Sequence, residues 1–146
     1  MKSLGSCINP MTGANASESG RFVILWHEVD NMPGRENHYD FLLETAGFFV
    51  TIELKALPWE VSETHGRVLS PHRLEYWELE GPVSGNRGNL KRITRGHYQC
   101  VSQAHGRWEL RLDSAEVQAG LTLTAESSAP FAQLPSDTLV RLTRMP

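Results

Sequence analysis

HYDFLLETAGFFVTIEL, residues 38–54, contains the pattern that decides the fold of this chain. It holds two short runs rich in aromatic and branched side chains, and turn residues separate them. Runs of the same kind recur along the chain: RFVILWH (21–27), NLKRITR (89–95), HYQCVSQ (97–103), GRWELRL (106–112), GLTLTA (120–125) and TLVRLTR (138–144). No stretch keeps a helical period over three turns, although one helical turn is compatible with residues 72–80. The spacing predicts an all-β protein, a small closed or partly open β-barrel of about eight strands with few or no helices.

Turn residues and composition define the extent of the domain. The 146 residues are 40% hydrophobic and 21% charged, which suits one globular domain of ordinary size. Residues 1–20 are rich in Gly, Ser and Asn and are expected to form a flexible N-terminal arm, so that residues 21–146 form the single domain. The Arg95-Gly96 pair is interpreted as a turn between two strands.

No feature of the sequence indicates a membrane or a secretory route. The longest purely apolar run, Phe22 to Trp26, is far shorter than the ~20 residues of a membrane-spanning helix. No secretory signal precedes it. We therefore expect a cytoplasmic protein that has no membrane partner and keeps its two cysteines reduced.

Charge is distributed unevenly along the chain. The net charge is −3, yet the formal charges between residues 84 and 108 are all positive and belong to Arg87, Lys91, Arg92, Arg95 and Arg107. This run is either a solvated basic face or a local anion-binding surface. Because the protein as a whole is mildly acidic, any contact with a polyanion should be confined to one groove.

The alternation of side chains places reactive groups together on one face of the HYDFLLE strand. Successive side chains of a strand point to opposite faces. Tyr39, Phe41 and Leu43 form the face expected in the core, and His38 and Asp40 lie side by side on the other. An imidazole nitrogen and a carboxylate oxygen suit a divalent metal such as Mn, Fe or Zn. The alternative is a solvent-facing His–Asp pair on a half-buried strand.

A metal site needs a third ligand from another strand. His27 ends the first β-rich run, and a hairpin that pairs this run with the next would join it to His38 and Asp40. Alternatively, His97 or His105 would complete the two-histidine-one-carboxylate triad of iron oxygenases. Both triads remain open at the level of the residues alone.

A second group of chemically capable residues is found in SPHRLEYWELEG, residues 70–81. A histidine beside an anionic reacting group can act as a general acid or donate a hydrogen bond to developing charge, and a tyrosine nearby can orient a phosphate oxygen. His72 and Tyr76 are the candidates for these roles. No P-loop, dinucleotide fingerprint, GxSxG elbow or HExxH motif is present in the sequence.

Five blocks in this order resemble a known family, the 3'-phosphoesterase domain of bacterial DNA ligase D, the end-joining ligase, which also occurs in stand-alone proteins. The blocks are FVILWH, HYDFLLE followed by a glycine turn, PHRLEYWELEG, GNRG with TRGHY, and HGRWEL. In the family they read approximately as a strand ending in His, HYDFRLE, DHPLDYxxFEG, a YGxG turn with DRGTY, and a GxxxL strand. The resemblance covers residues 21 to 112.

The resemblance implies a small β-barrel that binds manganese, or another transition metal such as zinc, and repairs the 3' ends of DNA by removing a terminal ribonucleoside or a 3'-phosphate. By position, His27, His38 and Asp40 match the family's metal ligands, and His72 and Tyr76 match residues that contact the scissile phosphate. A separate DNA ligase or polymerase is an expected partner. Arg87, Lys91, Arg92 and Arg95 are candidates for contacts with the DNA backbone, on charge alone.

The chain also departs from the family pattern. Leu42 stands where HYDFRLE has an arginine, so a cation expected to hold the phosphate is missing. Arg67 and Arg73 are candidates to replace it. These departures leave open a non-catalytic module of the same fold that binds metal and DNA.

Overall fold

A computed structural model describes residues 19–29, 33–83 and 87–146. Residues 1–18 of the expected N-terminal arm lie outside the described residues. The last two positions of the arm, Ser19 and Gly20, belong to the first strand.

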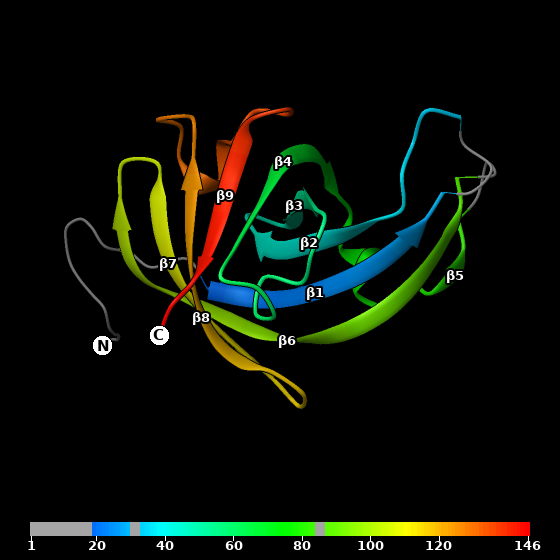
Figure 1. The fold of residues 1–146 in the computed structure, drawn as a ribbon, viewed down its shortest axis with the longest axis horizontal. Coiled ribbons are helices and arrows are strands. Elements are labelled where there is room, and N and C mark those ends of the chain that lie inside the picture. Colours follow the sequence, from blue (N-terminus) through cyan, green and yellow to red (C-terminus); the bar gives the residue numbers. More distant parts are fainter. Residues whose placement is uncertain (1–18, 30–32, 84–86) are drawn as a thin grey trace.

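Within the described residues, eight antiparallel strands close into a barrel, and one further short strand pairs with β6 (Figure 1). The strands are β1 (Ser19–Glu28), β2 (His38–Thr45), β3 (Phe48–Leu54), β4 (Glu63–His72), β5 (Gly81–Pro82), β6 (Asn89–Ala104), β7 (Arg107–Ser114), β8 (Gln118–Ala125) and β9 (Leu139–Arg144). Their order is β1-β2-β3-β4-β9-β8-β7-β6, β1 pairs with β6 to close the barrel, and β5 adds to β6. The predicted all-β barrel is therefore confirmed.

Helical structure is confined to short 3-10 turns in the part of the chain that the structure describes. They are η2 (Leu74–Trp77) and η3 (Phe131–Gln133). The first of these lies within the segment for which a helical turn was considered. Among these described residues, no helix has the length and apolar character needed to cross a bilayer.

Two local features differ from the sequence-based expectation. Strand β4 was not anticipated, because its sequence ETHGRVLSPH carries few apolar side chains and little alternation. Strand β6 is continuous through the Arg95-Gly96 pair, which was wrongly interpreted as a turn. Gly96 is needed there for space, since a Cβ at this position would lie 2.1 Å from the carbonyl oxygen of Asp113 on β7.

The interior of the barrel holds the main apolar core. Side chains from all eight barrel strands and from η3 contribute to it. On β1 and β2 these are Phe22, Ile24, Phe41 and Leu43, all fully buried, as alternation predicts. The Phe22 and Phe41 rings meet edge to face with centroids 6.2 Å apart.

The opposite face of β1 and β2 carries a second, smaller apolar cluster. Its buried members are Val23, Leu25, Leu42, Phe49 and Leu90. Five partly buried side chains from the segment 74–83, which contains η2, pack over them: Leu74, Tyr76, Trp77, Leu79 and Val83. Burial of this cluster attaches the 74–83 segment to the outside of the barrel, over the outer face of β1 and β2.

Candidate metal centre

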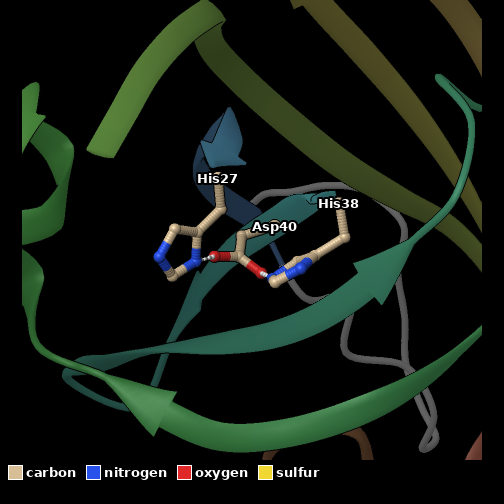
Figure 2. A group of neighbouring side chains, drawn as sticks. All are labelled: His27, His38 and Asp40. Atoms are coloured by element: carbon tan, nitrogen blue, oxygen red, sulfur yellow. Dashed lines mark ion pairs between the residues drawn. The ribbon is translucent and has the colours of Figure 1, made fainter. Parts of the chain in front are cut away.

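Strand register brings His27, His38 and Asp40 together. His27 is directly opposite His38 in the β1–β2 pair, and Leu25 is opposite Asp40. Residues directly opposite each other in an antiparallel pair share a face, so all three functional side chains project from the same side of the hairpin. Figure 2 shows both imidazole rings approaching the Asp40 carboxylate, one from each side.

The three side chains form a compact and largely buried group. His27 Nδ1 lies 3.3 Å from Asp40 Oδ2, and His38 Nε2 lies 3.0 Å from Asp40 Oδ1. One ligand atom from each of the three residues can be chosen so that all lie within 4.8 Å of one another. The side chains of His38 and Asp40 are only 4% and 3% exposed, and that of His27 is 16% exposed. The hairpin triad predicted from the sequence is therefore formed.

Backbone carbonyls set the orientation of both imidazole rings. His38 Nδ1 donates to the Glu36 carbonyl oxygen at 2.9 Å, and His27 Nε2 donates to the Arg87 carbonyl oxygen at 2.7 Å. In each neutral ring the remaining nitrogen, which faces Asp40, then carries a lone pair. This is how metal-binding histidines are usually held.

Gly88 permits this arrangement beside His27. Its φ is +101°, and a Cβ there would lie 2.0 Å from the Glu28 carbonyl oxygen and 3.2 Å from His27 Nε2. No side chain fits in that space. Glycine at this position lets the chain that carries the Arg87 carbonyl approach the ring.

Electrostatics favour an ionised Asp40. Burial acts to raise the pKa of this carboxyl, but its contacts with His27 and His38 outweigh burial and lower the pKa to about 2. Burial acts to lower the pKa of His38, and the Asp40 carboxylate outweighs it, so that the pKa of His38 is raised. The carboxylate therefore attracts positive charge, either protons on the rings or a cation held between them.

The donor set fits a divalent transition metal. Three buried side-chain atoms of neighbouring residues, His38 Nε2, Asp40 Oδ1 and Glu53 Oε1, converge here. His38 Nε2 and Asp40 Oδ1 face each other as an ion pair at 3.0 Å, and Glu53 Oε1 has no hydrogen-bond partner within the described ranges. Buried polar atoms are normally satisfied, so such a cluster indicates a site for a ligand. Two imidazoles and carboxylate oxygen suit Mn, Fe or Zn.

His72 and Tyr76 lie at one flank of this group. Their rings are in edge contact, with centroids 4.4 Å apart. Burial lowers the pKa of His72, while the nearby Asp40 opposes this shift and His27 and Arg87 add to it. His72 is therefore close enough to interact electrostatically with the triad. Its Nδ1 donates to the Ser70 carbonyl oxygen at 3.0 Å, which leaves Nε2 as the other reactive nitrogen.

The four predicted DNA-contacting cations lie on or just before β6 and have different partners. Lys91 pairs with Trp26, whereas Arg92 pairs with Leu25 and so projects from the face that carries the triad. Arg92 is held by Glu80 at 3.5 Å. Arg95 donates to the Trp77 carbonyl oxygen and to Glu78. Of the four, Arg87 is the one that interacts electrostatically with His72.

The alternative triads with His97 or His105 are not formed. His97 pairs with Arg21, six residues before His27 on β1, which corresponds to a separation of ~20 Å along the strand. His105 follows the end of β6 and lies farther still from the triad. The iron-oxygenase arrangement, which the residues left open as an alternative, is not formed, because strand register carries these histidines away from Asp40.

Glu53 is a neighbour of the site that sequence reasoning missed. It lies directly opposite Asp40 in the β2–β3 pair, and its Oε1 is 4.0 Å from His38 Nε2. Alternation within residues 47–54 separates Glu53 from its apolar neighbours, and this was the available signal. Its partner residue on β2 depends on register, which the sequence does not show.

The two candidates to replace the missing family cation lie in different surroundings. Arg67 on β4 approaches Glu53 Oε1 to 3.6 Å. Arg73 is 77% exposed and pairs with Glu75 at 3.8 Å. Leu42 itself is fully buried in the second apolar cluster. Arg67 is therefore the candidate that adjoins the metal centre.

No model of a known protein family matches this chain, and no curated protein matches it significantly. The function is accordingly inferred from the geometry of the site together with the residue blocks of the sequence.

Proposed function

We propose that this protein is a metal-dependent phosphoesterase that acts on the 3' ends of DNA. Removal of a terminal 3'-ribonucleoside leaves a 3'-phosphate, and removal of the 3'-phosphate leaves a 3'-hydroxyl. The metal is Mn²⁺, although the ligands also accept Zn²⁺ or another transition metal. The proposal rests on the candidate metal centre and on the five residue blocks that resemble the ligase D domain.

One observation carries the proposal. Two histidines and one aspartate converge within a mostly buried group, and backbone carbonyls hold both rings so that the remaining nitrogen of each faces Asp40. A structural ion pair does not need two rings with fixed orientation. A cation held between them satisfies the lone pairs and the carboxylate together.

In this proposal His72 and Tyr76 act on a phosphate at this centre. When bound, the metal would neutralise phosphate oxygens and activate a water. In the free protein the lowered pKa of His72 favours the neutral ring. The negative charge of a bound phosphate favours protonation, so His72 would then donate to the phosphate or to the leaving oxygen. Tyr76, in contact with His72, would orient a phosphate oxygen.

The overall reaction on a 3'-phosphate is hydrolysis. Water adds to phosphorus, the bond between phosphorus and the 3' oxygen breaks, and the leaving oxygen takes a proton, for which His72 is the donor. The products are inorganic phosphate and a 3'-hydroxyl. Because ligases and polymerases need a 3'-hydroxyl, a separate DNA ligase or polymerase is the partner we expect, in the cytoplasm where DNA is repaired.

The burial of Leu42 favours a second candidate function. A side chain that packs fully inside an apolar cluster supplies no cation to a phosphate. The second candidate is therefore a non-catalytic module of the same fold that binds metal and DNA ends. Turnover of a 3'-end substrate distinguishes the phosphoesterase from the non-catalytic module.

A primer–template assay tests the proposal. The purified protein is incubated with a primer ending in a 3'-phosphate or a 3'-ribonucleotide, with and without Mn²⁺, beside His38→Ala and His72→Ala. The matched control is His65→Ala, on the same strand as His72 but 69% exposed and paired with Glu63. We expect manganese-dependent product with the wild type and the control, and a loss of about 100-fold or more in both site variants. Metal binding that requires His38, without product from either primer, would reject the phosphoesterase and favour the binding module.

A further inference from the structure

Glu53 places a second carboxylate beside the His27, His38 and Asp40 group. It stands opposite Asp40 across the β2–β3 pair, so both acidic side chains project from the same face. The side chain of Glu53 is 23% exposed, but its Oε1 atom is buried. A carboxylate on this face therefore approaches the metal centre from β3, a strand that contributes none of the other ligands.

The surroundings of Glu53 Oε1 are unusual for a structural ion pair. Three nitrogens approach this oxygen: Arg35 Nη2 at 3.6 Å, Arg67 Nη2 at 3.6 Å and His38 Nε2 at 4.0 Å. None of them is within hydrogen-bond range, and the oxygen has no hydrogen-bond partner among the described residues. Arg35 and Arg67 thus confine the carboxylate without satisfying this oxygen.

The spacing is compatible with a shared metal ion. Two atoms that each bind one ion at ~2.1 Å are at most ~4.2 Å apart. Glu53 Oε1 and His38 Nε2 meet this limit at 4.0 Å. His38 Nε2 and Asp40 Oδ1, which form an ion pair with each other, are 3.0 Å apart and meet it as well. The ligand atoms of His27, His38 and Asp40 lie within 4.8 Å of one another, so this group would close by a few tenths of an ångström around a bound ion.

We propose that Glu53 is a fourth protein ligand of this metal centre. The inference rests on the proposed metal function and extends it, because the ligands become two imidazoles and two carboxylates. Oxygen-rich sets favour Mn²⁺ over Zn²⁺, and Zn²⁺ is satisfied by three protein ligands and one water. Glu53 would then give the site a preference for manganese that the other three ligands do not impose.

Metal titration of Glu53→Gln tests this role. Glutamine keeps the size of the side chain and removes its charge, and the matched control is Glu63→Gln, on β4 and paired with the exposed His65. Titration calorimetry gives the affinities for Mn²⁺ and Zn²⁺, and water-proton relaxation counts the waters on bound Mn²⁺. We expect Glu53→Gln to weaken Mn²⁺ binding at least about tenfold, to weaken Zn²⁺ binding less, and to add one bound water, with the control unchanged.

Unchanged Mn²⁺ affinity and hydration in Glu53→Gln would overturn the inference while leaving the three-residue site intact. A wild type that binds no Mn²⁺, or binding that is indifferent to His38→Ala, would instead overturn the metal centre and the inference with it. Circular dichroism of the metal-free variants checks folding. Should Glu53→Gln not fold, Glu53→Asp replaces it, because a carboxylate shortened by one methylene is expected to weaken Mn²⁺ binding in the same direction. Affinity and hydration equal to wild type in Glu53→Asp would also reject Glu53 as a ligand.

Discussion

The two faces of the β1–β2 hairpin follow the same alternation of side chains but have different roles. The inner face adds Phe22, Ile24, Phe41 and Leu43 to a core shared by all eight barrel strands. The outer face holds a smaller cluster, including Leu25 and Leu42, covered by a short segment, and the metal centre lies at its end. The difference between the two faces indicates that barrel stability and site geometry depend on separate sets of side chains. Substitutions on the two faces should therefore have separable effects.

The largest expected effect on stability comes from the inner face. Phe41→Ala removes a fully buried ring that meets Phe22 edge to face. We expect a loss of about 3–5 kcal/mol in the free energy of unfolding, because many strands converge on this position and cannot collapse into the cavity. Urea denaturation of the metal-free protein measures it. A loss below about 1 kcal/mol would show that the inner face is not the main source of stability.

The next effect comes from the apolar part of the outer face. Leu42→Ala should cost about 2–3 kcal/mol, less than Phe41→Ala, because the partly exposed 74–83 segment can move toward the cavity. That movement should change the fluorescence of Trp77, which packs on this cluster. Phe41→Ala provides the comparison. An equal cost for both variants, with unchanged Trp77 fluorescence, would contradict a separation of the two faces.

In the metal-free protein, the polar end of the outer face should make the free energy of unfolding depend on pH. The pKa of Asp40 is lowered to about 2 in the folded state, so its stabilisation is present above the unfolded pKa near 4 and disappears as the pH falls through about 2. The shift corresponds to about 2 kcal/mol. Urea unfolding of wild type and Asp40→Asn from pH 5 to pH 2 isolates this contribution from other carboxyls. Parallel pH profiles would mean that Asp40 is not stabilised by the two histidines.

The smallest effect is expected at the rim of the outer face. The guanidinium groups of Arg21 and Arg95 each contact the Trp77 ring, 4.9 and 4.8 Å from its centroid. Arg21→Ala removes the ring contact and the ion pair of Arg21 with Glu44 at 3.0 Å, both partly exposed, so it should cost about 0.5–1 kcal/mol and leave Mn²⁺ affinity unchanged. Lys91→Ala, an exposed cation paired with Trp26 on the other face, is the control. A change in Mn²⁺ affinity would show that the rim and the metal centre are coupled.

Part of the site was predictable from local sequence because alternation is a local property. Within 38–44 the period of two assigns His38 and Asp40 to one face, and the structure has them there. The same argument assigns Phe41 and Leu43 to the core, where both are fully buried. The choice between His27 and the distant His97 was not predictable from the residues alone, since it depends on which strands pair and in what register.

Other elements escaped prediction for identifiable reasons. Strand β4 lacks an apolar alternation because Arg67 and the adjacent polar side chains lie near a solvated rim. Gly96 resembled a turn residue, but it serves the close approach of β6 and β7. In both cases the decisive factor is a neighbouring strand that is distant in sequence.

The sequence by itself determined an all-β barrel, an apolar inner face, and an imidazole and a carboxylate sharing the other face of one strand. Only the tertiary structure decided that His27 completes this pair, that Glu53 stands opposite Asp40, and that Leu42 is buried beneath the 74–83 segment. The physical reason is that side-chain direction follows from the backbone of a single strand. Which side chains meet follows from the register between strands, and hydrogen bonds between distant parts of the chain set that register.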